Sequence, residues 1–333
     1  MPKKHAAQRR SSRLQKISAT SKRSHFTGLF FVMVNLFFWG IAPAIIKHGL
    51  DYVPPQVFLY YRFVIVLAVS TPFLFFMRKR YSGLKTPKQL VTLLTIGLLS
   101  NPITLGIFFL GLHYTTSASA AVISGVSPLF IIIASAIFLR EKITRNEVIG
   151  AVIATVGTFL IILETPEQAQ AMNPLLGNAL IFLYNIVWTG VVLWMKKLAD
   201  KHEPFLFGYT GWLMGAIVMG AVSLYTYPAF VLRPLMITQL PDALWPIVYM
   251  AIFGSLIAFT AYQISQKYLP ASEAGIFTYL EPLFAIPLSL FWLHEKLGTF
   301  FTVGSLVIFL GVCIAEFHAS SRLKRILTHH SRK

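Results

Sequence analysis

Residues 127–142 read SPLFIIIASAIFLREK, and residues 281–296 read EPLFAIPLSLFWLHEK. Eight of the sixteen aligned positions are identical, and each segment places a Pro thirteen residues before a Glu-Lys pair. Extending the same shift of 154 residues from Tyr114 to Gly157 raises the total to twelve identities. The chain therefore contains an internal repeat, which predicts that the fold is built from two copies of one unit.

A weaker match, at a shift of 150 residues, covers the parts of the chain that precede these segments. It pairs Asn35 with Asn185, Gly40 with Gly190, Lys47 with Lys197 and Pro54 with Pro204. We therefore expect two copies of one unit, the first over residues 27–164 and the second over residues 175–317. Two basic tails, residues 1–26 and 318–333, would flank them.

The composition excludes an ordinary soluble enzyme and a disordered chain. Apolar residues fill 56% of the 333 positions, and charged residues fill only 12%, about half of what a soluble chain carries. The single Cys, Cys313, excludes a disulfide framework and a cysteine-based zinc site. We expect no metal and no cofactor.

Ten apolar runs are long enough to be transmembrane helices, which need about 20 residues each. They lie at 27–47, 56–76, 90–112, 116–139, 146–163, 175–195, 204–226, 243–265, 270–292 and 299–317. The connections between them are too short for a soluble domain. We therefore predict an all-α membrane protein with ten transmembrane helices.

The basic residues predict the orientation, because Lys and Arg gather in cytoplasmic loops. Of the 29 Lys and Arg, 25 lie in the two tails and in loops 77–89, 140–145, 196–203 and 266–269. Both termini are thus expected in the cytoplasm. Each unit has five helices, an odd number, so the second unit crosses in the opposite sense to the first. Inverted repeats are typical of secondary transporters, whose halves exchange conformations around a midplane site.

The basic N-terminal tail has three other interpretations. A charge run beside a membrane span is usually a topology anchor, so we expect no nucleic-acid partner. Ala42-Pro43-Ala44 loosely fits a signal-peptide cleavage site, but the first span has a repeat mate and so belongs to the fold. Residues 1–50 hold no acid, as in a transit peptide, so an organellar membrane is the alternative to a bacterial inner membrane.

The chain resembles the EamA-type transporters of the drug/metabolite transporter superfamily over residues 28–317. The resemblance rests on Trp39-Gly40 followed by Lys47, on Pro55 with Arg62, and on the two repeated segments quoted above. It implies a cavity between the two halves and alternating access, and it leaves the substrate open. The second unit departs from the pattern, because Trp212 stands at the position equivalent to Arg62.

Glu281 is the foremost candidate for a functional residue. It lies about eleven residues into the ninth span, about 16 Å deep at 1.5 Å per residue. A charge at that depth costs about 2.5–3.5 kcal/mol, so the carboxyl should face protein or a wet cavity. Burial suits a group that takes up and releases a proton, and Glu281 is the proton-coupling candidate. The alternative is a protonated Glu that bonds a neighbouring helix.

Other polar residues within the spans have more than one interpretation. Arg62, about six residues into the second span, reaches the membrane interface, pairs with Glu281 or captures a substrate carboxylate. The amides of Asn35, Asn101 and Asn185 either bind substrate or hold helices together.

Aromatic residues and prolines complete the candidate set. Trp39 and Trp188 each follow an Asn by about one helical turn, so polar and aromatic groups share a face that suits an amphipathic molecule. Tyr184 and Tyr262 join them as candidate cavity residues, and packing is the alternative role for each of the four. Near the middle of the fourth and ninth spans, two prolines remove a helix hydrogen bond and are hinge candidates; these are Pro128 and Pro282.

We predict a secondary transporter that moves a small organic metabolite, amino-acid-like or drug-like, with export as the expected direction. The sequence has no nucleotide-binding Gly-Lys loop, so the drive would come from protons or from exchange. The alternatives are a channel or sensor, or a membrane-embedded lipid-modifying enzyme, which would need paired acids or a His cluster near the interface. No catalytic residue is assigned. The expected partners are the solute and the bilayer, and a homodimer is left open.

Overall fold

The computed structural model describes residues 24–76, 86–115, 117–162, 173–199, 202–281, 284, 303–304 and 306–315. The hinge candidate Pro282 lies outside these ranges, within which all regular structure is helical. Two shorter apolar helices span Ser127–Leu139 and Leu306–Ala315. In the described part of the chain, six helices are long and apolar enough to cross a membrane, so the chain is a multi-pass membrane protein; they are Ser24–Leu50, Pro55–Phe76, Pro87–Tyr114, Leu175–Leu198, Pro204–Thr226 and Pro241–Tyr268.

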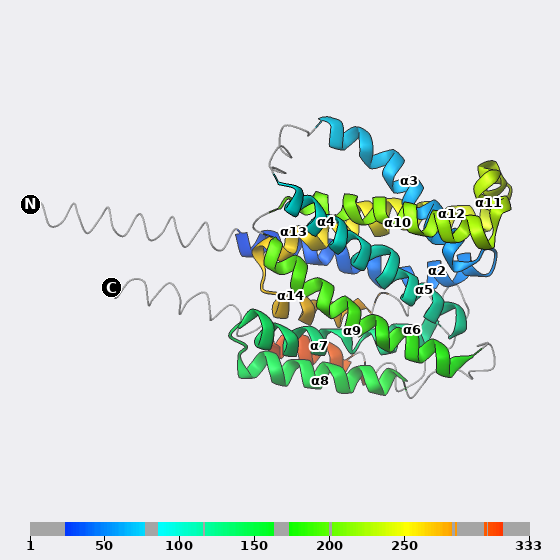
Figure 1. The fold of residues 1–333 in the computed structure, drawn as a ribbon. Coiled ribbons are helices and arrows are strands. Elements are labelled where there is room, and N and C mark those ends of the chain that lie inside the picture. The colour runs from blue at the N-terminus through cyan, green and yellow to red at the C-terminus, as the bar shows by residue number, and fades with distance from the viewer. Residues whose placement is uncertain are drawn as a thin grey trace, which may run out of the picture.

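The long helices run side by side between two ends of a bundle (Figure 1). Helix α3 (Pro55–Phe76) packs along α10 (Pro204–Thr226), which also contacts α4 (Pro87–Leu98). Helix α5 (Thr104–Tyr114) packs along α9 (Pro174–Leu198). Helices that the sequence assigns to different units are therefore direct neighbours.

Local signals in the sequence fix where these helices begin. Helices α4, α9 and α10 carry Pro in their first turn, where the missing N–H is not needed by the helix. The Thr86 side chain accepts a hydrogen bond from the Gln89 backbone, and the Asn173 side chain accepts one from Leu176. The predicted spans consequently start within a few residues of the observed helices.

Two long helices contain wide, π-helical turns at matching places. The helix Pro87–Tyr114 holds the segment η1 (Leu99–Ile103) between α4 and α5. The helix Pro241–Tyr268 joins α12 (Pro241–Tyr249), η5 (Met250–Phe259) and α13 (Thr260–Tyr268). Shifted by 154 residues, η1 falls at residues 253–257, inside η5. Wide turns of this kind are frequent at functional sites, and η5 contributes to the cavity described below.

The fourth span is broken rather than kinked. Helix α6 (Ser117–Ser124) ends, a turn follows at Gly125 and Val126, and α7 (Ser127–Ala134) starts anew. Pro128 therefore lies in the first turn of a helix, where it is tolerated, and not in the middle of one as the sequence predicted. Helix α14 (Ala271–Thr278) ends in a turn at the position that a shift of 154 residues places opposite the end of α6.

Glycines allow α8 (Arg145–Ile162) and the helix 306–315 to touch backbone to backbone. A Cβ added to Gly150 would lie 2.4 Å from the Gly311 carbonyl oxygen, and one added to Gly157 would lie 2.7 Å from that of Gly304. The repeat aligns Gly150 with Gly304 and Gly157 with Gly311. The Gly150–Gly311 contact and the Gly157–Gly304 contact are therefore equivalent under the repeat.

The remaining elements connect helices at the ends of the bundle. Helix α2 (Ala42–Leu50) completes the first span, and η2 (Ser135–Leu139) follows α7. A short helix α11 (Pro228–Leu232) and a 3-10 helix η4 (Pro234–Gln239) join α10 to α12. In Figure 1, α11 lies at the end of the bundle where α2 ends.

Side-chain contacts group the loops at what we call the Ser24 end of the bundle, where the first helix begins. The carboxylate of Glu141 accepts hydrogen bonds from the backbone N–H groups at the start of α14. At this end His25 Nε2 lies 3.3 Å from a carboxylate oxygen of Glu273, and an ion pair joins Lys267 to Glu203 at 3.6 Å. The chain around Glu141, Glu203 and Lys267 therefore lies together at this end.

A lysine caps the C-terminus of a helix at the end of the bundle opposite the Ser24 end, which we call the Leu50 end. Lys47, in the last turn of α2, donates hydrogen bonds to the carbonyl oxygens of Leu112 and Thr115, both at 3.0 Å. These carbonyls terminate α5, and a cation is favourable at the negative end of a helix. The Thr115 side chain also bonds Asn178 at 2.7 Å, which joins α9 to this end.

The matching arrangement occurs at the Ser24 end. Lys196, in the last turn of α9, donates to the carbonyl oxygen of Gln266 and, at 2.6 Å, to that of Leu269. These two acceptors are the repeat mates, at a shift of 154 residues, of those that Lys47 binds. The sequence comparison paired Lys47 with Lys197, whereas the contacts pair it with Lys196. We call the two arrangements the lysine caps.

Candidate functional site

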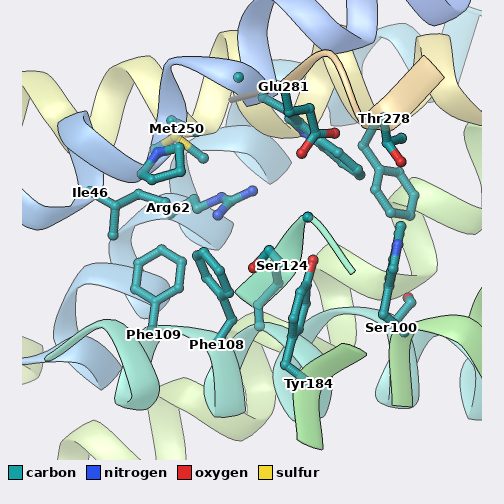
Figure 2. Close-up of a pocket in the computed structure, with 18 residues that line it drawn as sticks. Ile46, Arg62, Ser100, Phe108, Phe109, Ser124, Tyr184, Met250, Thr278 and Glu281 are labelled. Carbon is teal, nitrogen blue, oxygen red and sulfur yellow. The ribbon is translucent and has the colours of Figure 1, made fainter. Parts of the chain in front are cut away.

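A cavity lies between helices of both units, near the middle turns of the spans (Figure 2). It offers about 90 Å³ to the centres of water-sized molecules, several times the roughly 10–15 Å³ that one water requires. Among the residues that line it, the charged ones are Arg62 and Glu281. Much of the remaining wall is aromatic, from Trp39, Phe108, Phe109, Tyr184, Trp188 and Phe259.

Arg62 projects from α3 and is turned inward to the cavity rather than outward to a membrane interface (Figure 2). Its side chain is buried, and its Nε donates a 2.8 Å hydrogen bond to the Ser255 hydroxyl in η5. The guanidinium carbon lies 6.0 Å from the ring centre of Phe63 and 5.9 Å from that of Phe109. The hydroxyl and the two rings thus fix the cation in place.

Glu281 directly follows the turn at the end of α14, and its carboxyl points into the same cavity (Figure 2). Glu281 and Arg62 do not form a salt bridge with each other. Tyr184 projects from α9 toward the same space. The cavity therefore presents a cation and a carboxyl as separate groups.

Three of the predicted aromatic residues form one cluster, which we call the aromatic triad. The ring centres of Trp39, Trp188 and Tyr262 lie 5.6 to 5.8 Å from one another. The Trp39 indole also donates a 2.9 Å hydrogen bond to the carbonyl oxygen of Gly254 in η5. Trp39 and Trp188 are 149 residues apart, the same separation as the lysines of the two caps. Residues in equivalent places of the two units thus touch each other beside the cavity.

The structure places the three predicted Asn residues among helix–helix contacts rather than on the cavity wall. Asn35 donates a 3.2 Å hydrogen bond to the Ala258 carbonyl, and Asn185 donates a 2.6 Å bond to the Ile123 carbonyl. Asn101 donates to the hydroxyl of the preceding residue. The bonds of Asn35 and Asn185 join two helices, as in the interpretation in which the amides hold helices together. Asn101 bonds within its own helix and lies against Gly211 of α10.

The cavity wall also includes residues that the sequence did not single out. Ser124 and Thr278 both line it, and they are repeat mates at a shift of 154 residues. These two hydroxyl residues could have been predicted as a pair, because they occupy matching positions just before the two repeated Pro motifs. Ser255 carried no such signal, because its role depends on its contact with Arg62. Within the described ranges, no three His, Cys, Asp or Glu residues gather as a metal site.

The chain is similar to curated transporters and to a solved structure. A curated relative, the uncharacterized transporter YyaM of Bacillus subtilis, is 27% identical over 285 residues, which cover 84% of this chain and 90% of the relative. An uncharacterized transporter of Archaeoglobus fulgidus is 26% identical and covers 83% of this chain and 94% of its own. A solved crystal structure shares the fold, with a TM-score of 0.71 and 17% identity over 90% of this chain and 98% of that one.

The match to a protein family covers both expected units. Residues 26–163 and residues 175–317 each match the model of the EamA-like transporter family. Together these segments make up most of the chain, and they leave out the two basic tails and the connection between the units. The chain belongs to the EamA-like transporter family.

Proposed function

We propose that this protein is a secondary transporter that moves a small organic metabolite by alternating access. The observation that carries the proposal is the cavity whose wall comes from both units and holds two charged groups in an aromatic surrounding. A small number of polar groups in an apolar wall is the usual composition of a small-molecule site. An amphipathic solute, amino-acid-like or drug-like, fits this chemistry, and we propose export as the direction.

We propose ten transmembrane helices in two inverted five-helix repeats, residues 27–164 and 175–317. The lysine caps support this topology, because equivalent lysines bind equivalent carbonyls at opposite ends of the bundle. A parallel repeat would place both caps at the same end. The reciprocal glycine contacts and the matched π-helical segments are further support.

We propose that the Ser24 end faces the cytoplasm, together with both tails, and that the membrane is a bacterial inner membrane. The described residues of three basic loops, 140–145, 196–199 with 202–203, and 266–269, gather at this end. A concentration of Lys and Arg in short loops is typical of the cytoplasmic side.

Alternating access would use the two ends in turn. Release of the Lys47 cap would loosen the Leu50 end, and release of the Lys196 cap would loosen the Ser24 end. The aromatic triad would separate the cavity from the Ser24 end, since Tyr262 lies beside Trp39 and six residues before the end of α13. Glu281 would take up and release the coupling proton, and Pro128 would serve as a hinge at the break in the fourth span. No ATP would be consumed.

Flux measurements on purified protein in liposomes test the proposal. Labelled amino acids, organic acids, nucleosides and cationic drugs would be loaded, and their efflux measured with and without the same solute outside. A transporter gives saturable efflux that external solute accelerates, whereas a pore gives flux that rises linearly with concentration. Efflux no faster than from protein-free liposomes for every solute would contradict the proposal.

A further inference from the structure

Arg62 has unused hydrogen-bonding capacity in the cavity. Its relative exposure is 4%, and its one hydrogen bond among the described residues is from Nε to Ser255. The terminal nitrogen Nη1 is buried with no acceptor, and the guanidinium points into the cavity (Figure 2). A guanidinium carries five N–H donors in a planar fork, so most of its donors are left for another molecule.

A buried cation needs a compensating anion, because removing a charge from water is costly unless it is paired. Glu281 does not supply that anion in this structure, since the two groups share the cavity without a salt bridge. The aromatic rings beside Arg62 give only a weak cation–π contact. The planar fork matches a carboxylate, which it binds through two parallel hydrogen bonds.

The wall around Arg62 describes the rest of the ligand. Phe108, Phe109, Met250 and the aromatic triad residue Trp188 present apolar surface on several sides. A multiply charged or fully polar molecule would lose its hydration there without replacement. A single anionic group on an apolar body would satisfy both Arg62 and the wall.

We infer that Arg62 is the specificity-determining residue for a solute that carries a free carboxylate on an apolar body. The inference rests on the proposed function for the role of the cavity, and it adds the chemical class of the ligand. The carboxylate belongs either to an organic acid or to an amino acid, whose ammonium group would then face Glu281. In both cases Arg62 binds the carboxylate.

Binding of two matched pairs of probes tests this inference without any transport assay. The first pair is phenylacetate and phenylacetamide, and the second is phenylalanine and phenylalaninamide. Each amide keeps the aromatic body and removes the carboxylate charge. Tryptophan fluorescence of the detergent-solubilised protein reports binding, because Trp39 and Trp188 line the cavity.

We expect at least one acid to bind tenfold or more tightly than its amide, since charge-assisted hydrogen bonds to a buried group are strong. Arg62→Gln should reduce this preference to less than twofold, and Arg62→Lys should retain part of it. Arg145→Gln, at an exposed arginine in the first turn of α8, should leave the preference unchanged. The organic-acid pair and the amino-acid pair distinguish the two sources of the carboxylate.

Equal binding of acid and amide in both pairs, or no binding of either acid up to 10 mM, would overturn the inference. An acid preference that persists in Arg62→Gln would assign the carboxylate to another group and would also overturn it. If Arg62→Gln does not fold, the wild-type comparison and Arg62→Lys still decide. Failure of the flux experiment with an intact acid preference would instead contradict the transport proposal alone.

Discussion

Replacing Lys196 tests the lysine caps on which the proposed topology depends. Lys196→Met keeps the length and apolar stem of the side chain and removes the ammonium that binds the Gln266 and Leu269 carbonyls. A cation at a partly buried helix terminus stabilises by up to about 2 kcal/mol, and its hydrogen bonds contribute to the same total. We therefore expect Lys196→Met to lower the free energy of unfolding by about 2 kcal/mol, which is about 30-fold in the equilibrium constant.

The adjacent Lys197 provides a matched control. It lies on the same helix and its side chain is exposed, so Lys197→Met should change stability by no more than about 0.5 kcal/mol. Unfolding in mixed micelles with increasing denaturing detergent, followed by tryptophan fluorescence, measures both variants. Lys47→Met should resemble Lys196→Met because it removes the equivalent cap. Equal stability of Lys196→Met and Lys197→Met would show that the Lys196 ammonium does not stabilise the end of α13.

Three further predictions follow from individual contacts. Gly150→Ala should destabilise the protein by about 1–3 kcal/mol, because its Cβ would lie 2.4 Å from backbone of the opposite helix; Gly190→Ala, with no atom within 4 Å, should be neutral or stabilising in the same unfolding assay. Glu141→Gln should cost about 1 kcal/mol by weakening the cap on α14, whereas Glu203→Gln, in a partly exposed ion pair, should cost less. If Glu281 carries the coupling proton, efflux from liposomes should vary between pH 5.5 and 7.5 in the wild type and lose that dependence in Glu281→Gln; a dependence that persists would assign proton coupling elsewhere.

The sequence predicted where several helices begin, because these helix starts are specified locally. Length, apolar composition and a Pro in the first turn suffice to place α4, α9 and α10 within a few residues. The close contact of Gly150 with Gly311 also left a clear trace, because only glycine permits backbones to touch there.

Part of the candidate set lines the cavity, whereas Asn35, Asn101, Asn185 and Tyr262 do not line it. Arg62, Trp39, Trp188 and Glu281 line the cavity, but the sequence did not show that the cation and the carboxyl remain separate. That separation depends on how α3, η5 and α14 pack, and no local pattern records it.

Two details of the fold could not be predicted from the sequence. The register of the lysine caps differs by one residue from the sequence match, because Lys196 rather than Lys197 faces the end of α13. The break at Gly125 looks like a proline kink in the sequence, since Pro128 is compatible with either. Both details depend on how helices that are distant in the sequence pack against one another.

Labelling of the cavity from each side of the membrane tests alternating access directly. Ser124 lines the cavity, so Ser124→Cys in a Cys313→Ser background introduces one thiol there for a membrane-impermeant reagent. Right-side-out and inside-out vesicles expose the two ends separately. We expect Lys47→Met to speed labelling from the Leu50 end, and Lys196→Met to speed it from the Ser24 end. Labelling confined to the same side in both variants would contradict the account.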